Sequence, residues 1–337
     1  MSLLVVDEFG CYVGRRGEQV QVRKEGQTLV ERPLEEITCI NLEGRGISLS
    51  VDLIHECALR GISINCVDFD GEPYAKLMSP MLTATVETRR EQLLAFEDAR
   101  GVAIAKAIVD AKLANQRGLL LYSAKYRRKS QPQLGEQLLA AANAIGEFRT
   151  QLAAVEAQRI DDCRATLLNI EGRAGATYWA AFWQLLPEGL APGKREHQGA
   201  TDPVNALLNY GYGILYSQCW SAVLLAGLDP FGGFIHVDRP GKPSLVLDLQ
   251  EIFRQPVVDR VVLAMLNKGF RPTFEEEGRI AKAARRQYAA QVLDRLHTLV
   301  DFDGRRNTLQ SIIVQQARAL AVAVRGEKPL KPYVMRW

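Results

Sequence analysis

The sequence predicts an α+β protein in which a small, mostly β N-terminal domain, residues 1–80, precedes a larger all-helical domain, residues 81–337. Short runs of β-branched and apolar residues separated by glycines fill the first 80 positions, as is typical of strands and hairpins. Beyond Ser79-Pro80 the apolar residues recur three and four positions apart, a spacing typical of amphipathic helices. A chain of 337 residues is long enough for two domains.

The elements expected in the first domain are short. We expect hairpins at glycine turns: residues 3–6 are followed by a turn at Gly10, residues 11–13 by a turn at 14–17, and residues 19–22 and 27–30 flank a turn at Glu25-Gly26. Residues 62–67 and 74–78 are expected to form another hairpin across Asp70-Gly71. We expect two further strands, at residues 37–41 and 47–49. Ser50 is the expected N-cap of a short helix that runs to about Arg60 and ends at Gly61.

Helical periodicity dominates the second domain. We expect helices over 88–96, 102–121, 138–155 and 167–186, and others that begin near Val204, Ser244, Ala281 and Leu309. Residues 187–203 are polar and rich in Gly and Pro, which predicts a mobile loop. The last segment, 326–337, contains two prolines and is expected to be irregular.

The composition is that of a globular protein, with 47% hydrophobic and 24% charged residues. The apolar runs are shorter than the ~18 residues of a membrane span, and Asp7 and Glu8 interrupt the N-terminal segment, so we expect neither a membrane anchor nor a signal peptide. The six cysteines contain no C-x-x-C pair, so we expect no structural zinc site. They lie in apolar contexts, which indicates reduced core thiols and a cytoplasmic protein. The net charge of +3 does not by itself indicate a nucleic-acid binder.

Glu171 is a carboxylate in an apolar stretch. On a helix its same-face neighbours include Leu167, Leu168, Ala174 and Tyr178. An unpaired carboxylate among such neighbours costs several kcal/mol unless it pairs, titrates or binds a cation. The sequence therefore predicts a partner for Glu171.

Two further acids lie three positions apart on a later helix. With Ser244 as the expected N-cap, Asp248 and Glu251 project from the same side, opposite the apolar face. Like charges this close repel, so a positive group is expected beside them. Arg254 is one candidate; an ordinary surface pairing of that kind contributes only a few tenths of a kcal/mol.

His236 lies in a Gly- and Pro-rich turn that leads directly into this acidic helix. One imidazole with two or three carboxylates is a mixed N/O ligand set that suits Mg²⁺ or Mn²⁺. Such ions neutralise phosphoryl oxygens and help to activate an attacking water or hydroxyl. Four basic residues close to these positions are candidates either for binding DNA phosphates or for local salt bridges: Arg173, Arg239, Lys242 and Arg254.

Three segments together resemble a known family, the CRISPR-associated adaptation integrases called Cas1. They are LNIEGRAGATYW (168–179), DPVNALLNYGYGILY (202–216), and residues 232–254, which hold His236, Asp248 and Glu251. The β-then-α layout is also similar to that family, so the likeness spans essentially the whole chain.

The resemblance implies a metal-dependent DNA endonuclease and integrase. It implies that Glu171, His236 and Glu251 hold the metal and that Asp248 supports the site. It further implies that the β domain dimerises, that two dimers clasp the small partner Cas2, and that the 3′-hydroxyl of a double-stranded prespacer is joined to the CRISPR repeat. The sequence departs from the family at 193–201, where an Arg-rich run is usual, so His197 is not expected to be a ligand.

Two other functions remain open at this stage. The same residues would serve a structure-specific nuclease that acts on branched DNA in repair, with water in place of the 3′-hydroxyl. A non-catalytic DNA-binding scaffold, in which the acids only form salt bridges, belongs to a different class of protein.

Overall fold

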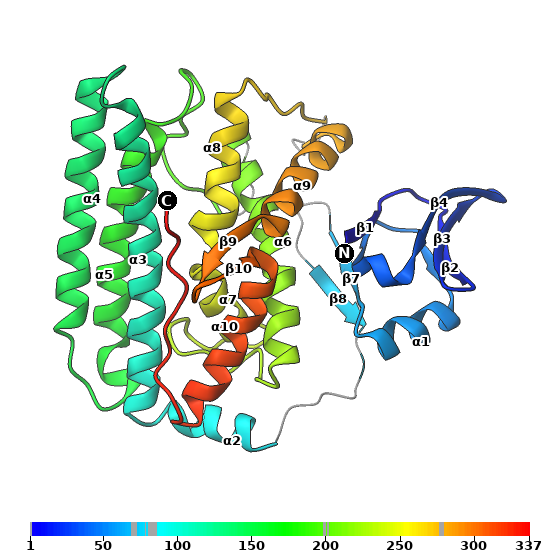
Figure 1. Ribbon diagram of the computed structural model, residues 1–337, viewed down its shortest axis with the longest axis horizontal. Helices are drawn as coiled ribbons and strands as arrows, with labels where there is room; N and C mark the ends of the chain where they lie inside the picture. Colours follow the sequence, from blue (N-terminus) through cyan, green and yellow to red (C-terminus); the bar gives the residue numbers. More distant parts are fainter. Residues whose placement is uncertain are drawn as a thin grey trace. The chain divides into compact units, whose positions relative to one another are not determined.

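The computed structural model describes residues 2–68, 73–77, 79, 86–197, 200, 202–275 and 280–337. The chain divides into two compact units, Met1–Leu82 and Thr83–Trp337. The first is β-rich and the second is predominantly helical (Figure 1), which confirms the predicted fold class. Pro80, at the expected boundary, lies outside the described residues.

Two four-stranded sheets make up the first unit. One has the strand order β1-β5-β7-β8, with β1 (Ser2–Val6), β5 (Ile37–Glu43), β7 (Ser63–Val67) and β8 (Pro73–Leu77). The other has the order β4-β3-β2-β6, with β4 (Gln27–Pro33), β3 (Gln19–Lys24), β2 (Tyr12–Arg16) and β6 (Ser48–Leu49). A 3-10 turn, η1 (Leu34–Glu36), and the helix α1 (Val51–Arg60) complete the unit, whose apolar core includes Val13, Ile40 and Leu53.

The predicted hairpins have different outcomes. β2 and β3 pair antiparallel, with the chain turning at Gly17 inside the expected turn 14–17, and β3 and β4 also pair antiparallel. β7 and β8 form the last predicted hairpin, although its expected turn at Gly71 lies outside the described residues. The first predicted hairpin is wrong, because β1 pairs in parallel with β5 while β2 pairs with β3. β1 is a continuous apolar run rather than an alternating one, which is typical of a parallel strand. The helix caps are confirmed: Ser50 accepts a hydrogen bond from Leu53 N at 3.2 Å, and Gly61 is left-handed with φ 68°.

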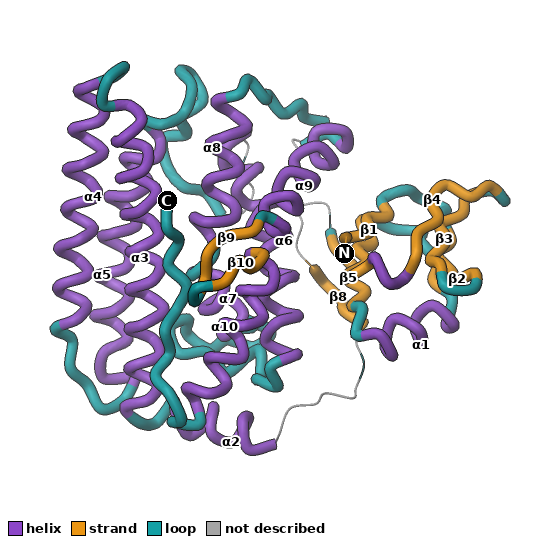
Figure 2. The backbone as a smooth tube through the Cα atoms, viewed as in Figure 1, coloured by secondary structure: helices purple, strands orange, loops and turns teal. Residues whose placement is uncertain are grey.

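Long helices build the second unit. They are α2 (Val86–Ala95), α3 (Ala99–Arg127), α4 (Pro132–Ala153), α5 (Ile160–Trp183), α6 (Pro203–Leu225), α7 (Ser244–Glu251), α8 (Arg260–Asn267), α9 (Lys282–His297) and α10 (Leu309–Val324), with a π-helical segment η2 (Arg254–Asp259) after α7. α3, α4 and α5 run side by side (Figure 2). Among the described residues, no helix has the length and apolar character that crossing a bilayer requires.

The prediction that the second unit is entirely helical is wrong. β9 (Leu299–Phe302) and β10 (Arg305–Thr308) form an antiparallel hairpin in it. Its two-residue turn is Asp303-Gly304, with φ 53° and 73°. Asp-Gly between two short runs is a strong hairpin signal, so periodicity alone concealed a feature that turn chemistry indicates.

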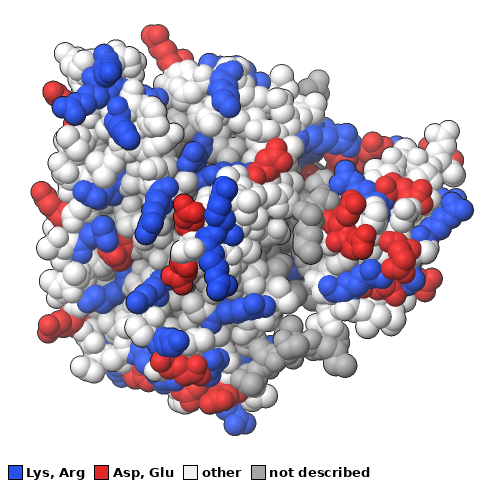
Figure 3. All heavy atoms as spheres, in the orientation of Figure 1, with Lys and Arg blue, Asp and Glu red and all other residues white. Residues whose placement is uncertain are grey.

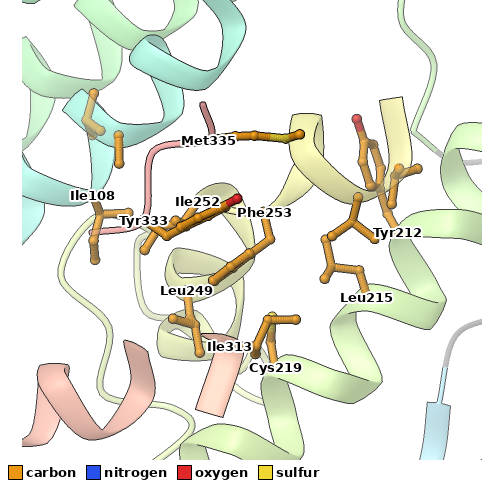
Figure 4. Packing of buried hydrophobic residues seen from close by; sticks show 14 of the residues in the cluster. Ile108, Tyr212, Leu215, Cys219, Leu249, Ile252, Phe253, Ile313, Tyr333 and Met335 are labelled. Atoms are coloured by element: carbon orange, nitrogen blue, oxygen red, sulfur yellow. The ribbon is translucent and has the colours of Figure 1, made fainter. Parts of the chain in front are cut away.

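The C-terminal segment, residues 326–337, contains neither helix nor strand, as predicted, but it is firmly packed. Tyr333 stacks on Phe253 with ring centroids 5.8 Å apart (Figure 4). The side-chain amide of Asn115 donates to Ile252 O at 2.9 Å and to Tyr333 O at 3.1 Å, and its oxygen accepts from Met335 N at 2.8 Å. Asn115 thus ties this segment to the backbone at the end of α7.

Candidate metal centre

The predicted acids and histidine lie in the helical unit, together with a lysine that the sequence analysis did not identify. Lys112 comes from α3, Glu171 from α5, and Glu251 from the end of α7. His236 lies in the loop that leads into α7. Each of the three helices packs apolar side chains into one core, and that packing holds the polar side chains in place.

Lys112 links the two glutamates. Its Nζ donates a hydrogen bond to Glu171 Oε1 and lies 2.5 Å from Glu251 Oε2. Only 10% of the Lys112 side chain and 6% of the Glu251 side chain are exposed, whereas Glu171 keeps 25% exposed. Glu171 therefore does have the partner that its apolar neighbours predict, and it forms the solvent-facing edge of the cluster.

Arg254 neutralises the other oxygen of Glu251, at 3.1 Å from Oε1. Burial would raise the pKa of the Glu251 carboxyl, but Arg254 and Lys112 outweigh it and lower that pKa to about 2. Burial likewise lowers the pKa of Lys112, yet its two carboxylate partners raise it overall. Glu251 and Lys112 are therefore both charged at neutral pH. Because Glu251 is buried, its pairing with Arg254 is a buried ion pair rather than the surface pairing that the sequence suggested.

Asp248 holds the loop of His236 in place. The carboxylate is fully buried, and its Oδ2 accepts from Phe234 N at 2.6 Å and Ile235 N at 3.0 Å. Its Oδ1 accepts from His236 N at 3.1 Å and contacts His236 Nδ1 at 2.7 Å. Because a carboxylate only accepts, Nδ1 must carry the ring proton, which leaves Nε2 of the neutral imidazole with a free lone pair. Asp248 thus orients the histidine for binding a cation through Nε2.

The start of α7 differs from the prediction. Ser244 is not the N-cap; Pro243 takes that position and provides no side-chain cap, and Ser244 is the first helical residue. The Ser244 N–H donates instead to Lys242 O at 2.9 Å, within the tight loop. Nor do Asp248 and Glu251 project to the surface, because most of α7 is buried.

The structure groups the predicted ligands in two pairs. Glu171 and Glu251 meet through Lys112, and His236 meets Asp248. His236 is also close to Glu251, because a proton added to its imidazole would lower the pKa of that carboxyl. Among the described residues, no three His, Cys, Asp or Glu side chains are already arranged to hold a metal ion.

The residues nevertheless fit a divalent cation. Glu251 Oε2 is buried, and the positive group beside it among the described residues is the Lys112 ammonium, 2.5 Å away, so this oxygen already lies next to a cation. Carboxylate oxygens that share a cationic partner, in a cluster that also holds an oriented imidazole, are a donor set that suits Mg²⁺ or Mn²⁺. The His236 side chain is 24% exposed, so the cluster is open at two of its members.

The four predicted phosphate-binding residues differ in setting. Arg173 is exposed on α5 and lies 4.7 Å from the Phe148 ring. Arg239 is exposed and Lys242 is half-buried, both in the loop before α7. Arg254 is committed to Glu251 inside the cluster. On the face shown in Figure 3, Lys and Arg side chains predominate over acidic ones in the middle of the helical unit.

Part of the predicted mobile loop contacts α6. Arg195 donates to Asn205 Oδ1 at 3.0 Å and to Asn209 Oδ1 at 2.6 Å. Burial, and then Arg195 and Arg254, lower the pKa of His197, which is therefore close to the cluster. Residues 198, 199 and 201 lie outside the described residues.

Lys112 and Asp259 are the buried charged residues that sequence reasoning missed. The helical neighbours of Lys112 at −4 and +4 are Ile108 and Gln116, both buried, so it is as anomalous as Glu171 and could have been found in the same way. Asp259 is fully buried and accepts from the Tyr178 hydroxyl at 2.6 Å and the Tyr212 hydroxyl at 2.5 Å. Nothing local in the sequence indicates that these tyrosines reach it.

The fold and this cluster define a two-domain α+β protein whose helical domain encloses a buried ionic centre of three acids, two cationic side chains and a histidine. Comparison with known proteins narrows this class to one family. Residues 4–293 match the family model described as CRISPR associated protein Cas1, and the chain belongs to that family.

Curated relatives match over nearly their whole length. The CRISPR-associated endonuclease Cas1 1 of Archaeoglobus fulgidus is 39% identical, covering 99% of this chain and 99% of the relative. The CRISPR-associated endonuclease Cas1 of Korarchaeum cryptofilum is 31% identical, covering 98% and 97%.

Solved structures share the fold. A casposase bound to integration product has a TM-score of 0.80 at 24% identity, covering 97% of this chain and 92% of that one. A Cas1 protein from Thermotoga maritima has a TM-score of 0.78 at 18% identity, covering 97% and 98%.

Proposed function

We propose that this chain is a divalent-metal-dependent DNA endonuclease and integrase of CRISPR spacer acquisition, and that it joins prespacer 3′-hydroxyls to the CRISPR repeat by transesterification. The observation that carries the proposal is the buried cluster of Glu171, Glu251 and the His236–Asp248 pair in a chain of the Cas1 family. The names of the relatives support it, since they are called endonucleases, and a structural neighbour is a casposase bound to integration product.

In this proposal Glu171, Glu251 and Nε2 of His236 hold Mg²⁺ or Mn²⁺. When bound, the ion would supply charge neutralisation at a phosphoryl oxygen and would acidify the attacking hydroxyl. Asp248 keeps the imidazole in the tautomer that presents Nε2. Arg254 keeps Glu251 ionised, and thus available as a ligand, at any physiological pH.

The remaining parts of the proposal concern partners. We propose that the unit Met1–Leu82 mediates a homodimer and that Cas2 joins two dimers, since structural neighbours include complexes that contain Cas1 and Cas2. Double-stranded DNA would be held by Arg173, Arg239 and Lys242, and Arg254 would act mainly inside the cluster. The protein would act in the cytoplasm.

The test supplies a prespacer duplex with free 3′-hydroxyls, a plasmid that carries a repeat array, and Mn²⁺ with or without a chelator. We expect half-site joining products that require Mn²⁺, and their loss in Glu171→Gln and His236→Ala with DNA binding largely retained. Asp238→Asn, at an exposed acid two residues after His236, is the matched control and should join normally. DNA affinity should fall steeply with salt, because phosphate contacts dominate.

Each alternative gives a different result in the same assay. Metal-dependent cleavage without joining favours the structure-specific nuclease. DNA binding without metal-dependent chemistry, or activity that survives both site substitutions, favours the non-catalytic scaffold and refutes the proposal.

A further inference from the structure

Lys112 is the one cationic side chain that Glu171 and Glu251 share. It contacts Oε1 of Glu171 and Oε2 of Glu251, while Arg254 contacts the opposite oxygen of Glu251. Its ammonium group therefore occupies the position of a cation that bridges the two carboxylates. These are also the carboxylates to which the proposed function assigns the metal.

The two cationic residues of the cluster are held very differently. The Arg254 guanidinium lies 4.6 Å from the Tyr212 ring centroid in addition to its ion pair, so packing fixes it on two sides. Within the described part of the chain, the ion pairs of Lys112 are with the two glutamates alone. Its charge is a compact ammonium on a flexible four-carbon stem, so it can move away without breaking a further ion pair.

We propose that Lys112 is a resident counter-ion of the metal site: it bridges Glu171 and Glu251 in the metal-free protein and competes with the divalent cation for their oxygens. The inference rests on the proposed metal dependence. An ammonium and a divalent cation placed between the same two oxygens repel each other strongly, because the repulsion rises steeply at such separations. Metal binding must therefore displace Lys112.

The competition has two measurable consequences. In the metal-free protein Lys112 offsets the repulsion between the two carboxylates, so removing its charge should destabilise that state. Removing the charge should also strengthen metal binding, because the ion no longer has to expel an ammonium from between its ligands. A lysine with a purely structural role would give the first effect without the second.

The experiment measures Mn²⁺ binding by titration calorimetry for the full chain and for Lys112→Met. We expect the variant to bind Mn²⁺ at least tenfold more tightly, which corresponds to about 1.4 kcal/mol. Thermal unfolding of the same samples should show a lower transition for the metal-free variant and a larger rise on adding Mn²⁺ than in wild type. Lys112→Gln, which keeps a polar group, should give the same tightening if Lys112→Met folds poorly.

Lys106→Met is the matched control. Lys106 lies on the same helix, and its Nζ donates to the backbone oxygens of Ala153 at 3.0 Å and Val155 at 2.5 Å, away from the acids. Its Mn²⁺ affinity should equal that of wild type.

The outcomes separate this inference from the proposed function. Equal Mn²⁺ affinity in wild type, Lys112→Met and Lys112→Gln overturns the competition and leaves the metal-dependent function standing. Mn²⁺ binding by the variants but not by wild type supports the competition and refutes the metal-dependent function. Binding by none of the proteins overturns both.

Discussion

Replacing Asp248 by Asn tests how the loop of His236 is held. The carboxylate accepts hydrogen bonds from three backbone N–H groups and from the imidazole, two on each oxygen. An amide has one oxygen, so an NH₂ group must face one of these pairs of donors. If it faces His236, one buried N–H loses its acceptor, at about 1–3 kcal/mol, and the two remaining bonds lose their charge assistance, at about 1 kcal/mol each.

The expected loss is therefore about 3–5 kcal/mol, or roughly 6–20 °C in the unfolding temperature of a domain of this size. The opposite orientation leaves two backbone N–H groups without an acceptor and is less favourable still. In the preferred orientation the NH₂ group donates to Nδ1, which moves the ring proton to Nε2. The lone pair that faces the metal position is then lost, and Mn²⁺ affinity should fall about 10–100-fold.

The assay combines scanning calorimetry with Mn²⁺ titration of Asp248→Asn and of Asp238→Asn. Asp238 is an exposed aspartate of the same loop, so its substitution should change the free energy of unfolding by no more than about 0.5 kcal/mol. An Asp248→Asn protein that unfolds within 2 °C (roughly 1 kcal/mol) of wild type and binds Mn²⁺ equally well would refute the reasoning.

Three other substitutions test the surrounding structure. The pKa of Glu251 is lowered to about 2, so its contribution to the free energy of unfolding is present above its ordinary pKa of 4.5 and is lost as the pH falls towards 2. Glu251→Gln should therefore cost on the order of 3 kcal/mol at pH 7. Urea unfolding at several pH values should show that this part of the pH dependence is absent in the variant. Asn115→Ala removes three hydrogen bonds and should cost about 2–4 kcal/mol; carboxypeptidase should then digest the C-terminal segment faster, and equal digestion rates would contradict this account. Gly211→Ala would place a methyl group against the Tyr288 hydroxyl and should cost about 1–3 kcal/mol in calorimetry; an unchanged transition would show that α6 yields there.

The order of the two domains and most of the helices could be predicted from periodicity. The strands were predicted less well, for two different reasons. The first predicted hairpin failed because β1 pairs with β5, more than thirty positions away, and no turn residue near Gly10 indicates that choice. The hairpin of β9 and β10 was missed although Asp303-Gly304 indicates it, since the prediction followed helical periodicity throughout the second domain.

For the candidate site, the useful signal in the sequence was a charged residue with apolar neighbours on the same face of a helix. That signal identified Glu171, and the structure places it beside Glu251 through Lys112. The sequence could not show that Lys112 bridges Glu171 and Glu251, because residues that pair over long distances along the chain have no characteristic spacing. Nor could it show that Asp248 binds the loop backbone, since those bonds depend on how the chain folds back over the start of α7.

Glu251 belongs to α7, and His236 is fastened to α7 by Asp248, so these two side chains form one mechanical body. Glu171 and Lys112 belong to a second body, the neighbouring helices α5 and α3. A small tilt of α7 would therefore carry the acid and the imidazole together and change their distance from both Glu171 and Lys112. Substitutions far from the centre that shift α7 should therefore move Glu251 and His236 together and change the affinity for the cation.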